Sequence, residues 1–307
     1  MRVIDNKPEC VMDLDKKELN RMINVDTPLI YHYTSKDVLP AFFEDNADLY
    51  CTNSKCLNDP SELYLGAYNF IDYLYRKGLV KKEHIRLFIS RIDEAVANDW
   101  FNVWLMSFTA CEDDLSQWRG YVSRSEGGFA IGFNASRLIR ALKKLMPLED
   151  IRVPNSIPMI AKCWYVLQDA SKIECLYDFM TSVRRDSFMN LCESVKEDSE
   201  TARKALAAIF PLAMHIKHDA FKDEKESRIA LMVTDDDFSK MKILGGKPRM
   251  PLGIPSLEVP LHTLIDKIYI SPHGNTESLM TLARWLRSKV KGNFEIVRSR
   301  IPYDPSR

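Results

Sequence analysis

The sequence predicts an α+β fold in which a central mixed or split β-sheet is flanked by helices. Strand-like runs of apolar, β-branched and aromatic residues occur along the chain and are separated by amphipathic helical stretches. Their order lacks the regular βαβ alternation of a doubly wound sheet. The two clearest strands, Val103–Thr109 and Gly128–Phe133, are expected to pair as a hairpin around which the chain is arranged.

Before this hairpin, the pattern predicts two strands and four helices, the first of them a short charged helix from Asp13 that ends before the turn at Thr27. Residues 29–34 are β-formers with alternating faces, and residues 48–52 form a shorter strand. Ser35 is a candidate N-cap for a helix through Phe43. Two further helices are expected over 61–75 and 81–98, because apolar residues recur there at helical spacing.

After the hairpin, Asn134 is expected to cap a helix that ends before Pro147. Residues 170–222 form the largest helical block, which we interpret as an insertion broken near Pro211. Residues 247–261 are rich in Pro and Gly, which favours a loop or bent edge strands. The remaining expected elements are strands at 160–167, 228–234, 265–271 and 294–298 and a helix over 275–291.

Length and composition indicate one soluble domain. We expect residues 1–28 to be an N-terminal extension and residues 29–307 to form a single α+β domain. The 43 acidic residues balance the 43 basic residues, so no overall field attracts nucleic acid or acidic lipid. The N-terminus lacks an apolar signal region, and no apolar run is long enough to span a bilayer. Seven scattered cysteines favour reduced thiols and a cytoplasmic protein.

The connection inside the expected hairpin carries an unusual group of side chains, Trp118, Arg119 and Tyr121. One interpretation is a ligand-facing wall built on a strand edge. The other is a connection whose tryptophan caps the core.

Two more segments allow both a functional and a structural interpretation. The strand Tyr31–Thr34 presents His32 and Thr34 on one face between two aromatic residues, which suits either ligand binding or a satisfied structural histidine. Asn58 and Asp59 precede a proline and a helix start, where they either form a turn or offer polar groups to a ligand.

Charged residues gather before the strand at 228–234. Glu224 and Glu226 share one side if the segment is extended, and one carboxylate there could stabilise positive charge in a substrate. A solvated charge run is the alternative. His215 and His218 would share a helix face, but no third metal ligand is specified, and we expect no metal.

Taken together, these blocks resemble the bacterial domain-of-unknown-function family 2971 (DUF2971), from Tyr31 to Tyr303. The blocks are YHYTS, LNDPSE, SFT–QWRGY–GFAIGF, E-x-E-x-R, IDKIYISP and VRSRIPY. The family usually has an aromatic residue after its glutamate, where this chain has Ser227. The order of the blocks is in turn similar to that of ADP-ribosyltransferase-like proteins.

This similarity implies an ADP-ribosyltransferase-like architecture and a site for NAD as the substrate, with Glu226 as the catalytic acid. His32 would hold the adenosine-side ribose, and Trp118 and Tyr121 would wall the nicotinamide pocket. The remaining residues implied to bind NAD are Tyr33, Thr34, Asn58, Asp59, Ser107, Thr109 and Arg119. Replacing Glu226 with Gln is expected nearly to abolish turnover and to leave the fold intact.

The function implied is an NAD-dependent ADP-ribosyltransferase or NAD glycohydrolase, of the kind that serves as a toxin or a phage-defence effector. Its partners would be a protein or nucleic-acid acceptor and an antitoxin or another component of a defence system, with no membrane. The alternative is a non-enzymatic sensor that binds a nucleotide-like ligand. A metal-dependent hydrolase that uses His215 and His218 is a third candidate.

Overall fold

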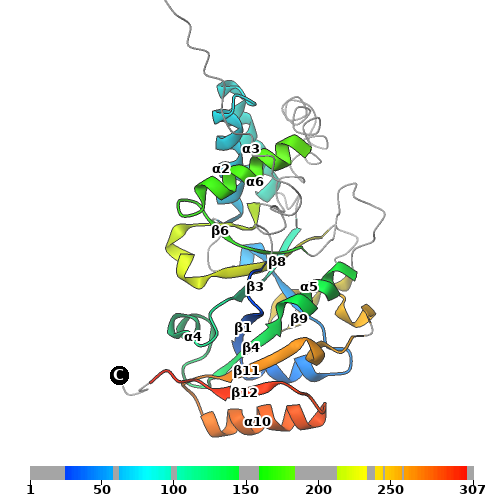
Figure 1. Ribbon diagram of the computed structural model, residues 1–307. Helices are drawn as coiled ribbons and strands as arrows, with labels where there is room; N and C mark the ends of the chain where they lie inside the picture. The colour runs from blue at the N-terminus through cyan, green and yellow to red at the C-terminus, as the bar shows by residue number, and fades with distance from the viewer. Residues whose placement is uncertain are drawn as a thin grey trace, which may run out of the picture.

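The computed structural model describes residues 25–57, 62–97, 102–144, 159–183, 213–233, 239–244, 246–257 and 259–302 (Figure 1). Within them, ten strands form a mixed sheet, and two more form a small parallel pair. The sheet strands are β1 (Leu29–Ser35), β2 (Tyr50–Asn53), β3 (Asn102–Thr109), β4 (Gly128–Asn134), β5 (Met159–Lys162), β8 (Glu226–Val233), β9 (Lys242–Leu244), β10 (Lys247–Pro251), β11 (Ile265–Ile270) and β12 (Glu295–Arg298). The expected mixed sheet flanked by helices is therefore confirmed.

The sheet divides at β3. One edge of β3 pairs with β8 along the whole strand, from Asn102↔Val233 to Thr109↔Glu226. The other edge is shared, because β2 pairs with its beginning and β1 pairs with its end. We call the place where β1 and β2 part along this edge the fork.

The expected hairpin between the two central strands is wrong. β3 and β4 do not pair with each other; β1 lies between them and pairs with β4 over seven residues. The connection between β3 and β4 holds a helix, α4 (Leu115–Tyr121), and is long enough to pass over β1. Strand periodicity predicts the pleat of each strand but does not identify its neighbour.

Helices cover both faces of the sheet. Trp104 and Met106 of β3 point into an apolar cluster that also holds residues of α5 (Ala135–Lys144) and α10 (Thr276–Lys289). Val103 and Leu105 point the other way, into a cluster with α2 (Glu62–Arg76), α3 (Lys82–Ala97) and α6 (Ala170–Val183). Figure 1 shows these three helices grouped at one end of the molecule and α10 next to β12 at the other. No described helix is long and apolar enough to cross a membrane.

A third, smaller apolar cluster lies under α4. It holds Trp118 of α4, Tyr31 and Tyr33 of β1, Ala130 of β4 and Tyr269 of β11. Because Tyr31 lies opposite Thr109 of β3, this cluster lies on the same sheet face as Val103 and Leu105. One face of the sheet therefore carries two apolar clusters, with the end of β3 between them.

Several expected elements differ from the structure. The helical block begins as α6, and its residues 184–212 lie outside the described part. From Ile216 the chain forms β7 (Ile216–Lys217), which pairs with β6 (Trp164–Tyr165), and then a 3-10 helix, η3 (Asp219–Glu224). The expected helix at 35–43 shortens to the 3-10 turn η1 (Leu39–Phe43), which contains Pro40. At Ile216–Lys217 strand pairing outweighs helix propensity, and in η1 Pro40 does so.

Candidate functional site

Polar residues from two strands occupy the region between the apolar clusters. Ser107 lies opposite Arg228, and Thr109 lies opposite Glu226, so all four are placed on the face that also carries Leu105. Thr109 Oγ1 donates a 2.5 Å hydrogen bond to the carbonyl oxygen of Glu224. This contact joins the end of β3 to the segment that leads into β8.

Five charged side chains meet beside this point. We call Glu62, Lys217, Glu224, Glu226 and Arg228 the ion cluster. Lys217 Nζ lies 2.5 Å from Glu226 Oε2 and 2.7 Å from Glu224 Oε2. Arg228 Nε lies 2.5 Å from Glu226 Oε1. The cluster therefore joins β8, β7 and η3.

Glu62 extends the cluster to the helical layer. It is the first residue of α2, and its Oε2 lies 2.7 Å from an Arg228 guanidinium nitrogen. It also lies 3.5 Å from Lys217 Nζ. The guanidinium of Arg228 in addition donates to the carbonyl of Met214. The cluster thus ties the first turn of α2 to the central sheet.

The cations hold Glu226 in its ionised form. Burial alone would raise the pKa of Glu226, but the charges of Arg228 and Lys217 outweigh burial and lower the pKa to about 2. Burial would lower the pKa of Lys217, and the neighbouring carboxylates raise it instead. Near neutral pH, Glu226 is therefore an anion whose charge is compensated, and it has no proton to donate.

This arrangement also gives Glu226 a structural task. Substituting Gln would leave two buried cations short of a partner, a change that typically destabilises a protein. A loss of turnover in Glu226→Gln would therefore need to be separated from a loss of stability. The expectation that this substitution leaves the fold intact does not follow from the structure.

His32 lies at the fork, beyond the last paired residues of β1 and β3. Its Nδ1 donates a 3.0 Å hydrogen bond to the carbonyl of Ser107, which can only accept, so the proton is on Nδ1. Burial lowers the pKa of His32, and the charge of Arg249 lowers it further. The ring packs against Phe108, which belongs to the apolar cluster on the opposite face from Ser107.

The other expected β1 residues divide between the two faces. Thr34 is buried and alternates with Tyr33, so it is placed on the His32 face. Tyr33 packs edge-on against Trp118, with ring centroids 4.6 Å apart. Its hydroxyl donates to the carbonyl of Cys111 and accepts from the backbone of Asp114. Tyr33 therefore anchors α4 to the sheet.

Trp118, Arg119 and Tyr121 of α4 differ in their exposure to solvent. Trp118 is fully buried and donates from Nε1 to Asp113, 2.8 Å away. This matches the interpretation in which the tryptophan caps the core. Arg119 is exposed, and Tyr121 is 42% exposed, with its hydroxyl 3.3 Å from Glu224 Oε1. Of the expected wall, Arg119 and Tyr121 are the residues that a ligand can reach.

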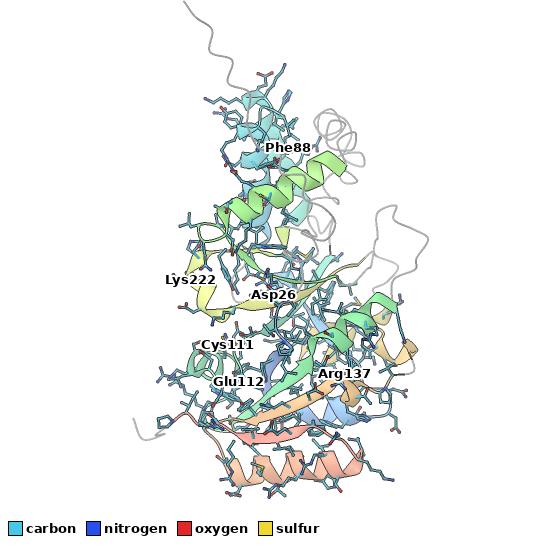
Figure 2. The ribbon with its side chains drawn as sticks, in the orientation of Figure 1. Asp26, Phe88, Cys111, Glu112, Arg137 and Lys222 are labelled. Atoms are coloured by element: carbon cyan, nitrogen blue, oxygen red, sulfur yellow. The ribbon has the colours of Figure 1, made fainter. Side chains whose placement is uncertain are left out.

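A second contact joins η3 to the chain before α4. Cys111 Sγ lies 3.8 Å from the carbonyl of Asp223. In Figure 2 the two segments lie on the same side of the molecule, with η3 marked by Lys222 and the β3–α4 connection marked by Cys111 and Glu112. The face with Tyr121 and Glu224 is thus held from both ends of α4.

The histidines of the third candidate function do not form a pair. His215 is buried against Trp164, whereas His218 is exposed and accepts from Ala220 as the N-cap of η3. Because Ile216–Lys217 is a strand, the expectation that the two histidines share a helix face is wrong. Within the described residues, no group of His, Cys, Asp and Glu is arranged to hold a metal ion.

Three residues of the ion cluster were not predicted from the sequence, and two predicted residues cannot be compared with the structure. Asn58 and Asp59 lie outside the described residues. Lys217, Glu62 and Arg228 had no expected role, although Glu62 belongs to the LNDPSE block and Arg228 to the E-x-E-x-R block. The sequence did hold a signal for these residues, because charged side chains occur in both the LNDPSE and the E-x-E-x-R blocks. Side chains from the two blocks meet in the ion cluster.

One family model matches part of the chain. The model of the family described as "Protein of unknown function (DUF2971)" matches residues 117–229. This stretch runs from α4 into β8 and includes Tyr121, Glu224 and Glu226. The resemblance to this family is therefore confirmed over these residues. Neither the curated proteins nor the solved structures contain a significant match.

Proposed function

We propose that this protein uses NAD as a substrate, as an ADP-ribosyltransferase or an NAD glycohydrolase. The observation that carries the proposal is the convergence of three strands at the end of β3. There β3 brings Ser107 and Thr109 and the start of β8 brings the Glu224–Glu226 segment to one face of the sheet, whereas β1 brings His32 to the opposite face, against Phe108. The similarity to ADP-ribosyltransferase-like proteins implies these three strands in this order.

The reaction would use the carboxylate charge. The bond between nicotinamide and ribose breaks, its electron pair leaves with nicotinamide, and positive charge develops on the ribose. Water or an acceptor nucleophile then forms the new bond and loses a proton. A fixed carboxylate beside the ribose stabilises the cation, and removing such a partner typically costs about 10²–10³ in rate.

His32 would act as a hydrogen-bond acceptor for the ribose. Its Nδ1 proton is committed to Ser107, and its lowered pKa keeps the ring neutral. Nε2 of the neutral ring then carries a lone pair that can accept from a ribose hydroxyl. Because His32 lies on the sheet face opposite Glu224 and Glu226, it would hold the adenosine-side ribose away from the reacting bond and would take no part in proton transfer.

The direct test is nicotinamide release. The purified protein is incubated with NAD, with and without candidate protein or nucleic-acid acceptors, and nicotinamide is measured by chromatography. Release that requires an acceptor identifies a transferase, and release in buffer identifies a glycohydrolase. If no nicotinamide appears under either condition, the catalytic proposal is wrong.

The compensated charge of Glu226 favours a second candidate function, a non-enzymatic nucleotide sensor. A carboxylate paired with two cations has less charge to offer a developing cation. A sensor would bind NAD or ADP-ribose in isothermal titration and release no nicotinamide. This combination of results would select the sensor over the enzyme.

A further inference from the structure

We propose that Glu224, together with Tyr121, is the ligand-facing carboxylate of this site, and that Glu226 is a positioning residue that acts through Lys217. The inference rests on the proposed function and changes its residue assignment. It is drawn from the contacts, exposure and charge count of the ion cluster.

The two carboxylates differ in exposure and in number of partners. The side chain of Glu226 is 5% exposed, and its two oxygens are held by Lys217 and by two nitrogens of Arg228. The side chain of Glu224 is 22% exposed. Among the described residues, one of its oxygens is bound to Lys217, and the other receives the hydroxyl of Tyr121 alone. A ligand can approach Glu224 without breaking the core of the cluster.

The charge count points to the same residue. In the part of the chain that the structure describes, the cluster holds three carboxylates and two cations, so one negative charge is in excess. Glu226 contacts both cations, whereas Glu224 shares a single lysine with two other carboxylates. The excess negative charge is therefore centred on the most exposed carboxylate, where it can stabilise a cationic ribose.

A ligand can replace the contact between Tyr121 and Glu224. Its hydroxyl lies 3.3 Å from Glu224 Oε1, a longer distance than the 2.5 to 2.7 Å contacts to Lys217. Since the phenol is the partly exposed partner, a ribose hydroxyl can take its place at the carboxylate. The displaced ring would still offer an aromatic face to the nicotinamide or adenine base.

The backbone places both carboxylates on Lys217. Lys225, between them, has φ of 44°, in the left-handed region that non-glycine residues rarely adopt. This residue turns the chain from η3 into β8, so Glu224 and Glu226 approach the same amine from the two sides of the turn. Glu226 holds Lys217 in the core, and Lys217 in turn fixes Glu224.

The test compares single variants with a charge-conserving double variant, by kcat and KM for nicotinamide release and by Tm. Glu224→Gln should retain the wild-type Tm and lose about 10²–10³ in kcat. Glu226→Gln alone should lower Tm, because Lys217 and Arg228 each lose a charged partner.

The double variant Lys217→Met with Glu226→Gln removes one charge of each sign. Arg228 keeps Glu62 and the amide oxygen of Gln, so Tm should return toward the wild-type value. Turnover should then fall by about tenfold, less than in Glu224→Gln, since Glu224 is still present but has lost the lysine that positions it. If the double variant folds like the wild type and is as inactive as Glu224→Gln, Glu226 itself is catalytic and the inference is overturned.

Failure of the proposed function is recognised separately. If the wild type neither binds nor cleaves NAD, that function is wrong, and the assignment of Glu224 is decided by chemical modification. A carbodiimide couples a small amine to reachable carboxylates, and peptide mass spectrometry locates the product. Modification of Glu224 without Glu226 in the folded protein supports the inference, and equal or greater modification of Glu226 overturns it.

Discussion

At the scale of single residues, His32 links protonation to stability. Its Nδ1–H bond to Ser107 joins β1 and β3 beyond their last paired residues, and burial lowers its pKa below the ordinary 6.5. The unfolded chain therefore binds a proton at a higher pH than the folded chain. Unfolding free energy is complete above pH 6.5 and falls as the pH drops through the lowered pKa.

We predict that Asn in place of His32 removes this dependence. The Asn amide can still donate to Ser107 but does not titrate near neutrality. Between pH 7 and pH 5 the wild type should lose more unfolding free energy than His32→Asn, at a limiting slope of about 1.4 kcal/mol per pH unit. Urea unfolding at both values measures the difference. His262 and His273, whose pKa values burial also lowers, remain in both proteins and cancel. An equal change of unfolding free energy with pH in the two proteins would show that His32 is not the group responsible.

Tryptophan burial gives a second prediction at this scale. Trp118 is fully buried under α4, whereas Trp285 on α10 is 57% exposed to solvent. Trp118→Ala should cost about 3–5 kcal/mol of unfolding free energy, since it leaves a cavity under α4. The matched change Trp285→Ala should cost less than about 0.5 kcal/mol. Similar losses in chemical denaturation would show that α4 does not depend on the buried ring.

The residue types in the sequence indicated which segments form the candidate site. They did not show which residues of those segments are buried and which a ligand can reach. Trp118 and Tyr121 lie three positions apart in one short helix, and only their burial distinguishes a core residue from a reachable one. Glu224 and Glu226 looked equivalent as an alternating pair. Their difference depends on Lys217 and Arg228, whose positions follow from tertiary folding.

At the scale of elements, α2 is joined to the sheet by a charged contact at its first residue. Glu62 is buried and contacts Arg228 of β8 and Lys217 of β7. A carboxylate at a helix N-terminus also interacts favourably with the helix dipole. The helical layer is thus tied to the sheet by charge as well as by apolar packing.

We predict that Glu62→Gln lowers the unfolding free energy by about 1–3 kcal/mol, because the buried ion pair with Arg228 is lost. Glu83→Gln is the matched control, since Glu83 is in the first turn of α3 and its side chain is 70% exposed. The control should change stability by less than about 0.5 kcal/mol. Equal effects in thermal or chemical unfolding would assign the Glu62 effect to the helix dipole alone.

Helices were predictable from the sequence because their signals are local, whereas strand pairing was not. Helices α2, α3, α5 and α10 begin and end within two residues of the expected positions, because apolar periodicity and caps such as Asn134 are local signals. Strand partners were not predictable in this way. The pairing of β3 with β8 depends on residues more than a hundred positions apart, and no local pattern records it.

At the scale of the whole molecule, the candidate site depends on where the sheet divides. β1 and β2 share one edge of β3, and β8 occupies the other edge. The end of β3 therefore adjoins β1 and the Glu224–Glu226 segment at once. The mixed sheet was expected from the sequence, but the position of the fork was not, since it is set by the register of non-local pairs.

The late arrival of β8 has a consequence for how the protein is made. A ribosome releases β3, a strand of eight mostly buried residues, long before it synthesises Glu226–Val233. Until then, one whole edge of an apolar strand has no native partner, and such edges favour pairing with other chains. Synthesis that stops before β8 would leave this edge open. Nascent or truncated chains of this protein therefore carry a greater risk of aggregation than the finished molecule.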